Sequence, residues 1–586
     1  MNPVCGMKRT LPLLIVLSVL LRAQAWEFAD PRVSTYVRPV RIMWMTPDGE
    51  KRSIANERAL VSRRYAQIPE GKFWKGDGAL FTNNGENPAI LLDFGREIHG
   101  GIEIGCGLFT EDKALTRSTV KCRIRLGESV TEAMSDLKEN GACNGHGMRD
   151  MTEDLISNGM RFFGDMGFRF VRIDLLEPGT LQLEYVMAVS KMRPWKKAGH
   201  FRSSDERLNR IFDTAAHTAH LCAQRFIWDG IKRDRLVWAG DMYPQILTIL
   251  AVYGADKVIT DSLGYLADIT PPDEWMCIPS YSMWWLAGAY EHYFSSGDDS
   301  FLRSRKEYIA GMYENLSRHI AIDGSCTISN AVLDWPTRKT PPAARAGHQA
   351  LFSRTFRIGS EIFRALGDET VAADLAAKAE KTALKGLSHH DSKAAAAMLA
   401  LYGLRDPGEM FSQSLGKDGL KGMSTFFGGF MLEAMFKAGE RRHALDSLRD
   451  YWGAMLDMGA TSFWEGFDVS WTNNAVRVDE MPVPGRPNVH ADFGDFCYKR
   501  CRNSLCHGWS SYPAAWIIRN VLGVRPLTPG CGEVEVRPFL GDLEWAEGAL
   551  ATPLGPVEVK VLKMRDGTLK TEISAPDGVK VRRRVE

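Results

Sequence analysis

Three aspartates, Asp229, Asp234 and Asp241, lie close together in the segment WDGIKRDRLVWAGDMYPQ. The same segment holds cationic side chains, including Arg233, and aromatic rings that would stack on a sugar, including Trp238. Carboxylates accept hydrogen bonds from hydroxyl groups and serve as general acids and bases, while arginine donates a rigid fork of hydrogen bonds. A solvated loop joined by surface ion pairs is the usual alternative, but such a loop has no use for the rings. The segment therefore predicts a sugar-binding site.

A second acidic and aromatic patch, FWEGFD, lies far downstream and offers Glu465 beside another candidate sugar-binding ring, Trp464. Hydrolysis of a glycoside requires one carboxylic acid, which protonates the leaving oxygen, and one carboxylate, which attacks carbon or activates water. Crowding among the three aspartates raises the pKa of one of them, whereas the neighbouring cations oppose that effect, so the residues alone do not assign the acid. We interpret Glu465 as a candidate base; the alternative is a carboxylate at a helix end that backbone N–H groups satisfy. Two separated patches of this kind predict a glycosidase.

Two further positions are weaker candidates for contacts with a sugar. Asp334 and Trp335 precede Pro336 and predict a second sugar-binding pair on a loop, although an aspartate in this setting is also a good turn former. His507 precedes the last expected helix, where it would contact a hydroxyl group. The alternative for His507 is a structural histidine whose ring nitrogens are already satisfied.

Composition and cysteine spacing narrow the expected partners and cofactors. Lys plus Arg number 73 and Asp plus Glu number 72, which argues against nucleic acid or an anionic membrane as the main partner. Cys497, Cys501 and Cys506 lack the paired C-x-x-C spacing of a zinc site, and one adjacent histidine does not complete a ligand set. We expect these thiols to be buried or to form a disulfide, and we expect no metal and no cofactor. The expected partner is a carbohydrate.

The N-terminus has the features of an export signal. Lys8 and Arg9 provide positive charge, residues 11–21 form an apolar run, and the sequence AQA before Trp26 is a small-residue cleavage site. The apolar run falls short of the roughly 20 residues that a membrane-spanning helix needs. We therefore expect a signal peptide over residues 1–25 and a secreted or periplasmic protein without a membrane span.

The hydrophobic periodicity changes twice along the rest of the chain. Short alternating runs separated by turns predict an N-terminal β-sandwich domain over residues 26–197. A capping box formed by Ser203 and Glu206 opens a region of roughly a dozen helical runs, which predicts a helical toroid over residues 198–524. Alternating strands return and predict a C-terminal β-sandwich over residues 525–586. The main strand runs of the first domain are 89–94, 101–104, 120–126, 168–175 and 181–186, and the helical runs after the first are 241–253, 256–267, 281–295, 300–319, 347–366, 369–384, 392–403, 424–438, 441–457 and 509–521.

The chain resembles the bacterial α-L-rhamnosidases of glycoside hydrolase family 78. The resemblance rests on a series of motifs in a fixed order: LDFGREIHG, GFRFVRIDLL, DGIKRDRLVWAGD, LDW, TSFWEGFD, SLCHGWS and ATPLGPVEV. It implies a multidomain fold, with an all-α (α/α)6 barrel catalytic domain flanked by the two β-sandwiches, and hydrolysis with inversion. It also implies that Asp234 is the general acid and Glu465 the general base. The residues that would bind the terminal sugar are Asp229, Arg233, Asp241, Asp334, Trp335 and His507.

One position departs from the family pattern. The usual residue at the acid position is glutamate, whereas this chain has Asp234, which is one methylene shorter. Three explanations are open at this point: the backbone approaches the substrate more closely, the enzyme acts on a different sugar, or a neighbouring carboxylate has taken the acid role.

We therefore expect an exported, inverting exo-glycosidase that removes terminal α-L-rhamnosyl or closely related residues from plant or bacterial glycans. Two alternatives stay open. A polysaccharide lyase on a similar helical toroid would use His507 or Tyr512 to handle protons and would release an unsaturated sugar. A sugar-binding homologue without catalytic turnover is also compatible with the substitution at Asp234.

Overall fold

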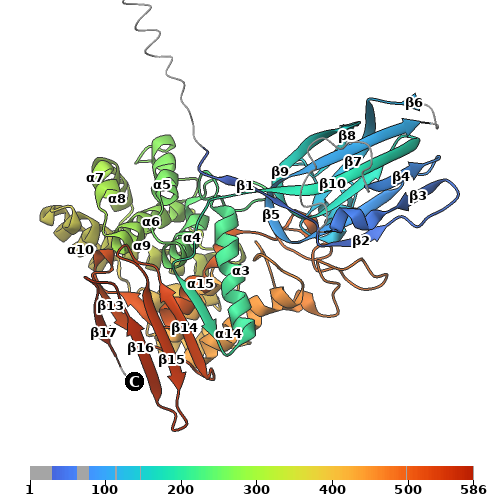
Figure 1. Cartoon of the computed structure of the whole chain (residues 1–586). Coiled ribbons are helices and arrows are strands. Elements are labelled where there is room, and N and C mark those ends of the chain that lie inside the picture. Colours follow the sequence, from blue (N-terminus) through green and yellow to red (C-terminus); the bar gives the residue numbers. More distant parts are fainter. Residues whose placement is uncertain (1–29, 63–77, 112–114, 146, 497, 585–586) are drawn as a thin grey trace, which may run out of the picture.

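The computed structural model describes residues 30–62, 78–111, 115–145, 147–496 and 498–584. These residues form an N-terminal sheet domain, a central helical region and two C-terminal sheets. In Figure 1 the N-terminal sheet lies to the right of the helices, and the C-terminal sheets lie below them. The predicted signal peptide lies outside the described residues. Over the described ranges, no helix is both long enough and apolar enough to cross a membrane.

The N-terminal domain is one sheet, which has ten strands in the described part of the chain. Its central strand β5 (Ala89–Glu111) pairs antiparallel with β9 (Gly159–Leu175) on one side and with β10 (Gly179–Met192) on the other. The strand order is β3-β4-β10-β5-β9-β7-β8, with β1 beside β10 and with β2 and β6 beside β5. The other strands are β1 (Val33–Val37), β2 (Arg41–Met45), β3 (Arg52–Ala55), β4 (Ala79–Asn83), β6 (Leu115–Thr116), β7 (Thr119–Gly127) and β8 (Asp150–Ile156).

The predicted strand runs of this domain all lie inside observed strands. The predicted β-sandwich would have two separate hydrogen-bonded sheets, whereas the observed strands form one. The strands join in a single sheet because β5 and β9 are long and continue through register shifts, which follow Asp93 and Gly100 in β5. Inward-facing aliphatic and aromatic side chains, including Phe81, Ile104 and Phe168, build one buried core against the sheet. Alternation therefore predicted the strands and their buried faces, while strand length decided how they connect.

The central region lies where the helical periodicity predicts it. The first helix, α3, corrects one detail: its N-cap is Asp205, whose side chain accepts a hydrogen bond from the Leu208 N–H at 3.1 Å. The predicted cap, Ser203, ends a strand instead, and both its N–H and its hydroxyl donate to the Asn209 side chain. The helices are α3 (Glu206–Cys222), α4 (Ala239–Val252), α5 (Lys257–Ile269), α6 (Pro279–Ser296), α7 (Ser300–Ser304), α8 (Lys306–Ser317), α9 (Pro341–Ala365), α10 (Glu369–Thr382), α11 (Lys393–Leu401), α12 (Pro407–Met410), α13 (Gly428–Lys437), α14 (Arg441–Asp457) and α15 (Pro513–Asn520).

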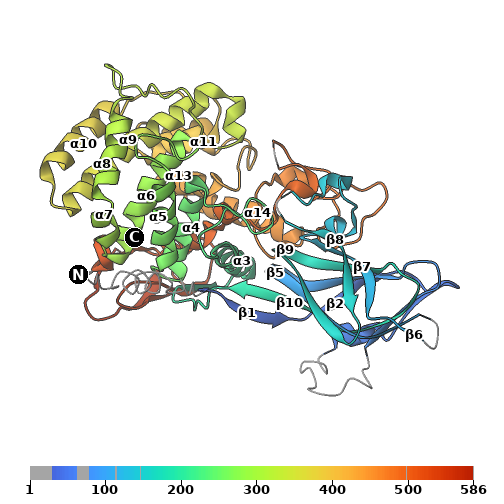
Figure 2. The same ribbon diagram turned by 90° about the horizontal axis from the view of Figure 1, so that it is seen from above.

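Within the described residues, six of these helices contact one another in a closed series. Helix α4 packs on α6, α6 on α9, α9 on α11, α11 on α13, α13 on α15, and α15 returns to α4. Figure 2 shows most of these helices grouped together on one side of the molecule. Asp241 in the first turn of α4 accepts a hydrogen bond from Tyr281 in the first turn of α6. These two helices therefore begin at the same end of the series.

Two small sheets complete the fold. One contains β11 (His200–Ser203), β14 (Trp545–Leu550), β15 (Val557–Lys563) and β16 (Leu569–Ser574), and the other contains β12 (Val524–Pro526), β13 (Glu533–Val536) and β17 (Lys580–Arg583). Strand β11 comes from the beginning of the range predicted for the helical domain, and its Phe201 lies opposite Gly548 of β14. The C-terminal sheet thus takes one strand from the segment that leads into α3.

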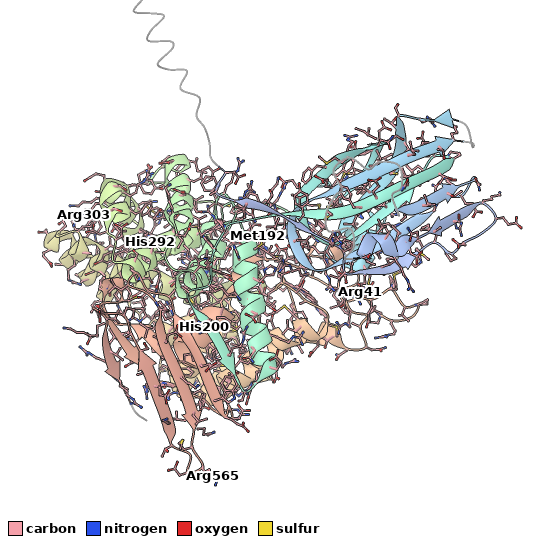
Figure 3. All side chains as sticks on the ribbon, in the orientation of Figure 1. Arg41, Met192, His200, His292, Arg303 and Arg565 are labelled. Atoms are coloured by element: carbon pink, nitrogen blue, oxygen red, sulfur yellow. The ribbon has the colours of Figure 1, made fainter. Side chains whose placement is uncertain are left out.

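The N-terminal sheet is packed firmly against the helical region. Met192, the last residue of β10, lies at the junction in Figure 3 and packs on a buried cluster that includes Cys222 and Cys506. Arg169 of β9 donates a hydrogen bond to the carbonyl oxygen of Gly459, just beyond α14, at 3.0 Å. These contacts bring the sheet next to the long connection between α14 and α15.

Candidate active site

The aspartate-rich segment forms a tight loop between α3 and α4. The Asp229 carboxylate accepts a hydrogen bond from the Leu236 N–H at 2.9 Å, and the Asp229 N–H donates to the Leu236 carbonyl at 3.0 Å, which closes the loop. Between these residues, Asp234 and Arg235 have positive φ angles of 54° and 53°. Left-handed backbone at residues other than glycine costs on the order of 1–3 kcal/mol each and is concentrated at functional sites. The closed loop holds the Asp234 backbone in a conformation that it would not adopt alone.

Arg233 connects Asp234 and Glu465, the two carboxylates to which the family resemblance gives the roles of acid and base. Its Nη2 donates to both carboxylate oxygens of Glu465 at 2.5 Å, and its Nη1 lies 3.4 Å from Oδ1 of Asp234. Because one planar guanidinium spans both contacts, the nearest oxygens of the two carboxylates lie within about 8 Å of each other. Glu465 is nearly fully buried, whereas a quarter of the Asp234 side chain is exposed (25%). The pair therefore joins one enclosed carboxylate to one that reaches solvent.

Glu465 is held in place by the long connection between α14 and α15, and it does not lie at a helix end. Its Oε2 accepts a hydrogen bond from the Ser504 N–H at 3.1 Å, and its own N–H donates to the Ser504 carbonyl at 2.9 Å. Its backbone carbonyl accepts hydrogen bonds from the Thr425 hydroxyl and from Nε1 of Trp509. With Arg233, these partners fix both the main chain and the carboxylate, so Glu465 has little freedom to rotate.

His507 lies between two buried acidic residues. Its Nε2 is 3.1 Å from Oδ2 of Asp241, whose Oδ1 accepts a 2.6 Å hydrogen bond from the Tyr281 hydroxyl. Its Nδ1 is buried without a hydrogen-bond partner and lies 3.9 Å from Oε1 of Glu465. Burial by itself lowers the pKa of His507, but Glu465, the bond to Asp241 and the nearby Asp229 outweigh it and raise the pKa above its ordinary value. The imidazole is therefore readily protonated and becomes a donor directed at Glu465.

Asp229 lies behind this histidine. Its main chain pairs with that of His507, because the carbonyl of Asp229 accepts the Gly508 N–H at 2.7 Å and Gly230 forms a β-bridge with His507. Burial, with the negative charge of Asp241 nearby, raises the pKa of Asp229 well above its usual range. Asp229 and Asp241, at the two ends of the aspartate-rich segment, thus position His507.

A pocket of about 370 Å³ opens beside Glu465. Asp334 lies on its wall, where Oδ1 accepts the Trp335 N–H at 2.7 Å and Oδ2 accepts the Ser424 hydroxyl. Burial raises the pKa of Asp334 to about 6, although these hydrogen bonds oppose the change. Aromatic rings form the rest of the wall, as expected for a site that takes a sugar ring. The aromatic lining consists of Trp335, Phe467, Trp471, Phe496, Tyr498 and Trp509.

Two of the predicted sugar-binding rings, Trp464 and Trp238, lie outside this pocket. Trp464 is only 1% exposed and packs in the core against Phe467, so it does not face the pocket. Trp238 packs edge-on against the Tyr281 ring and lines a separate depression beside α5. Adjacent residues of an extended segment point in opposite directions, which is why Glu465 reaches the site while Trp464 enters the core.

Sequence reasoning missed Tyr281 and most of the aromatic wall. Tyr281 begins a helix and carries no motif that distinguishes it from a core residue. Trp471, Phe496 and Tyr498 lie on the long connection between α14 and α15, where the concentration of aromatic residues was the available signal. Trp509 stands in the SLCHGWS motif but was not selected.

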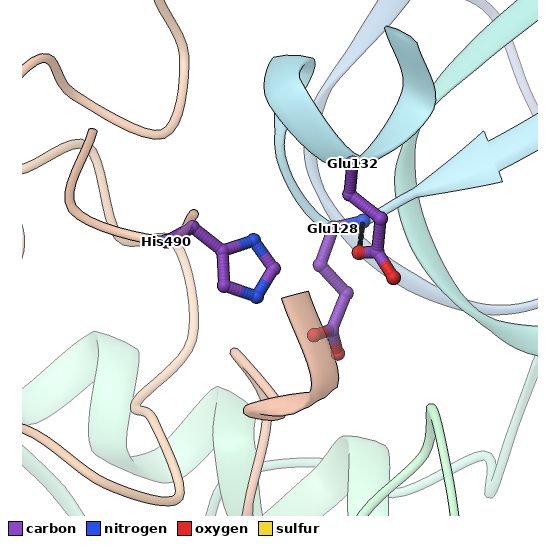
Figure 4. A group of neighbouring side chains, drawn as sticks. All are labelled: Glu128, Glu132 and His490. Atoms are coloured by element: carbon purple, nitrogen blue, oxygen red, sulfur yellow. Dashed lines mark hydrogen bonds between the residues drawn. The ribbon is translucent and has the colours of Figure 1, made fainter. Parts of the chain in front are cut away.

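A buried cluster of Glu128, Glu132 and His490 has the geometry of metal ligands (Figure 4). Lys232 takes the place that a cation would fill: its Nζ lies 3.0 Å from Glu128 and 3.3 Å from Glu132. Both ring nitrogens of His490 are also used, Nδ1 by the Ser129 hydroxyl at 2.7 Å and Nε2 by a backbone carbonyl at 2.9 Å. An ammonium group therefore balances these carboxylates, and we assign no metal to them.

The predicted cysteine trio is only partly described. Cys501 and Cys506 are buried thiols, as one of the two expectations had it, while Cys497 lies outside the described residues. Burial raises the pKa of both described thiols, which keeps them in the protonated form. No disulfide joins any of the cysteines that the described ranges contain.

Lys232 also ties the N-terminal domain to the site. Besides its ion pairs with Glu128 and Glu132, its Nζ donates to the carbonyls of Cys501 and Asn503, each at 2.8 Å. Glu128 accepts hydrogen bonds from the Ser504 hydroxyl at 3.2 Å and the Leu505 N–H at 2.5 Å. The loop that carries Ser504 and His507 is thus anchored on carboxylates of the neighbouring domain.

Two family models match the chain. The bacterial alpha-L-rhamnosidase 6 hairpin glycosidase domain matches residues 196–386, and the bacterial alpha-L-rhamnosidase C-terminal domain matches residues 523–583. Among curated proteins, none matches. The two matched regions coincide with the first half of the helical region and with the C-terminal sheets.

Solved structures with a similar fold include three rhamnosidases. A GH78 family rhamnosidase of Bacillus sp. GL1 is 20% identical with a TM-score of 0.71, over 90% of this chain and 55% of that one. The Streptomyces avermitilis α-L-rhamnosidase, solved with L-rhamnose, is 17% identical with a TM-score of 0.66, over 93% and 50%. A rhamnosidase from Klebsiella oxytoca, with rhamnose bound, is 18% identical with a TM-score of 0.61, over 84% and 96%. The chain therefore spans about half the length of the first two. These likenesses establish the shared order of sheet domain, helical domain and C-terminal sheet domain.

Proposed function

Because the chain belongs to the bacterial α-L-rhamnosidases, a family of glycoside hydrolases, we propose that it removes terminal α-L-rhamnosyl or closely related residues from plant or bacterial glycans, with inversion. One observation carries this proposal: Arg233 joins Asp234 to Glu465, and Glu465 lines the aromatic pocket. Carboxylates on two sides of a concave site with stacking surfaces are the requirement for cleaving a glycoside.

In the proposed reaction Asp234 donates its proton to the glycosidic oxygen as the bond from that oxygen to the anomeric carbon breaks. Glu465 accepts a proton from a water molecule, whose oxygen bonds to the anomeric carbon from the opposite face. Inversion needs carboxylates about 6.5–9.5 Å apart, so that the water fits between them. The separation of at most about 8 Å that Arg233 imposes is compatible with this spacing.

The backbone around Asp234 has an unusual conformation that bears on its shorter side chain. Asp234 and Arg235 both adopt left-handed conformations, and the loop is closed at its base by the pairing of Asp229 with Leu236. This geometry favours the explanation that the main chain at Asp234 approaches the substrate more closely and makes up for the missing methylene. The other two explanations, a different sugar or a different acid, are outcomes of the kinetic test below.

The neighbouring polar groups are assigned to sugar binding and positioning. Asp334 accepts hydroxyl hydrogen bonds in its ionised form, and Trp335 and Trp509 provide surfaces for the sugar ring. His507, held by Asp241, directs its unpartnered Nδ1 toward Glu465 and donates to a sugar hydroxyl or to the attacking water. These roles need no metal and no cofactor.

We also propose the finer architecture and location. The closed series of six helices within the described residues supports an inner ring of an (α/α)6 barrel, with its outer helices drawn from α3, α5, α8, α10, α12 and α14.

Export to the periplasm or the medium rests on the N-terminal sequence. N-terminal sequencing of the secreted protein tests it: a chain that begins at Trp26 supports export, and an intact Met1 in the cell contradicts it.

The decisive experiment compares Asp234→Asn and Glu465→Gln on two α-L-rhamnosides, one with an aryl and one with an alkyl leaving group. Loss of either general catalyst costs about 10²–10⁴-fold in rate. Asp234→Asn should retain far more activity on the aryl substrate, because a nitrophenolate leaves without a proton, whereas Glu465→Gln should slow both substrates equally. Asp446→Asn, which removes an exposed carboxylate on α14, is the matched control and should leave kcat unchanged.

The product distinguishes the remaining alternatives. Proton NMR of the first turnover should show the β-anomer of the released sugar, and the α-anomer would contradict inversion. A product that absorbs in the ultraviolet, with both carboxylate variants fully active, would indicate the lyase. Tyr512, one of the two groups that could handle protons in that mechanism, is buried and stacked on Phe430. Saturable sugar binding without turnover would indicate an inactive homologue.

A further inference from the structure

A second pocket, of about 360 Å³, lies among α6, α9, α11 and α15, and none of its lining residues takes part in the candidate active site. It is built from the later turns of these helices: Glu291 lies near the end of α6, Tyr402 caps the end of α11, and Arg519 lies near the end of α15. The active-site residues Asp241 and Tyr281 lie in the first turns of α4 and α6, at the other end of the helix series from Glu291. The two pockets therefore open toward opposite ends of the helix series.

Stacked aromatic rings separate this pocket from the candidate active site. Tyr243 stacks on Trp284 with ring centroids 4.8 Å apart, Trp284 on Phe430 at 5.2 Å, and Phe430 on Tyr512 at 5.9 Å. All four side chains are buried. The second pocket is therefore a separate site and not an extension of the first.

The charges around the second pocket are unbalanced. Four arginines line it, Arg354, Arg357, Arg519 and Arg525, against two glutamates, Glu291 and Glu361. Glu433, which pairs with Arg525 at 3.0 Å, stands behind the lining. Even with Glu433 included, an excess of positive charge remains. Unlike a surface charge cluster, this one surrounds a cavity large enough for a small molecule.

The hydrogen bonding of these arginines is incomplete, although Nη2 of Arg354 donates to the Tyr243 hydroxyl at 3.2 Å. Arg354 and Arg519 share the Glu291 carboxylate only through long contacts of 3.6 Å each, beyond hydrogen-bonding distance. Nε of Arg354 is buried and has no partner. Within the described ranges Arg357 forms no ion pair with any acidic residue. A salt-bridge network that served only to close the end of the helix series would bring its charges into direct contact, as buried ion pairs need close geometry to offset desolvation.

We propose that this pocket binds a small oxyanion-bearing ligand, through a carboxylate, sulfate or phosphate group held by Arg354, Arg357 and Arg519. Guanidinium forks match the paired oxygens of such groups, and charge-assisted hydrogen bonds of this kind are short and strong. The rings of Tyr290 and Phe294, stacked 5.6 Å apart, border the arginines and give a carbon skeleton an apolar surface. An acidic sugar therefore fits the lining better than a free inorganic ion.

Isothermal titration calorimetry on the full chain tests this proposal without any activity assay. Glucuronate, sulfate and phosphate are titrated separately at constant ionic strength, with glucose as the neutral control. We expect saturable binding of one ligand per chain, tightest for glucuronate, and none for glucose. If sulfate binds as tightly as glucuronate, the site is a free-anion site, and the proposal holds for the oxyanion without the sugar skeleton.

Two exposed arginines on the same helix provide a matched comparison. Arg357→Ala removes a lining guanidinium, and Arg364→Ala removes one about two turns further along α9, outside the lining. We expect Arg357→Ala to weaken anion binding at least about tenfold and Arg364→Ala to leave it unchanged. Absence of saturable binding below about 10 mM, or equal affinity in Arg357→Ala and wild type, overturns the proposal. Glu465→Gln should bind the anion normally, so failure here is independent of the proposed catalytic function.

Discussion

Replacement of Lys232 by methionine tests how the N-terminal domain supports the site. Methionine keeps an unbranched stem that reaches as far as the lysine Cε, but it removes the ammonium that pairs with Glu128 and Glu132. It also removes the hydrogen bonds to the carbonyls of Cys501 and Asn503, both at 2.8 Å. The variant therefore leaves two buried carboxylates and two buried carbonyls without their cation.

The expected cost is large because every partner is buried. The side chains of Lys232, Glu128 and Glu132 are 7%, 0% and 2% exposed. Removing one partner from a buried ion pair costs about 3–5 kcal/mol, because it leaves an uncompensated charge. The penalty falls on the loop that carries Ser504 and His507, so we expect kcat to fall as well as the free energy of unfolding.

The stability that Lys232→Met loses should depend on pH. Burial raises the pKa of Glu128 to about 7, and Lys232 is the main influence that lowers it. Without Lys232 this pKa rises further above its unfolded value of 4.5. The folded variant then binds more protons than the unfolded chain, so its stability falls as pH rises through and above that unfolded value. The difference between variant and wild type should be smallest near pH 4.5 and largest at alkaline pH.

Urea denaturation at about pH 5, 7 and 8.5 measures this effect, with stability and activity followed on the same samples. Lys257→Met is the control, because Lys257 pairs with Asp261 at the surface and its side chain is 80% exposed. We expect it to cost no more than about 1 kcal/mol at any pH. The double variant Lys232→Met/Glu128→Gln should recover part of the loss. If Lys232→Met costs as little as Lys257→Met, the anchoring argument is refuted.

Three other changes probe the site directly. Arg233→Lys keeps the charge but cannot contact Asp234 and Glu465 together, so kcat should fall about 10²-fold with little change in stability; unchanged kcat would contradict the bridging role. Asp334→Asn should abolish an acidic limb near pH 6 in the profile of kcat/KM, because wild-type activity rises as Asp334 ionises through its pKa of about 6; persistence of that limb assigns it to another group. Tyr281→Phe removes a hydrogen bond to the buried Asp241 carboxylate, and kcat should drop about tenfold or more. Ser280→Ala is the neighbouring control, because it removes a buried hydroxyl that has no hydrogen-bond partner.

Most elements of the fold follow from local pattern. Alternation places the runs 89–94 and 168–175 in strands, and the helical period places 281–295 in α6, because side chains that repeat at the period of an element must share its buried face. The start of α3 shows the limit of such rules. Serine and aspartate are both good N-cap residues. Asp205 caps α3 because Ser203 belongs to strand β11, which pairs with β14.

The chemical character of the site could also be predicted from the sequence. Clustered carboxylates and rings mark the segment of Asp229, Asp234 and Asp241 and the patch of Glu465 as a candidate glycosidase site, because few other uses require acids and aromatics together. The resemblance to the family, and not the residues alone, gives the acid role to Asp234. Spacing along the chain, however, contains no information about which residues face the pocket. Trp464 and Glu465 are neighbours, yet one side chain enters the core and the other the site.

Composition and periodicity were enough to establish which residue types are present, the order of sheet, helices and sheet, and two separate acidic patches. Folding places Arg233 between those patches and brings Glu128 to the loop of His507. Folding also brings arginines of α9 and α15 into one pocket at the far end of the helices. The physical reason is that periodicity reports burial along one element, whereas such contacts arise between elements, where packing and desolvation of charge choose the partner.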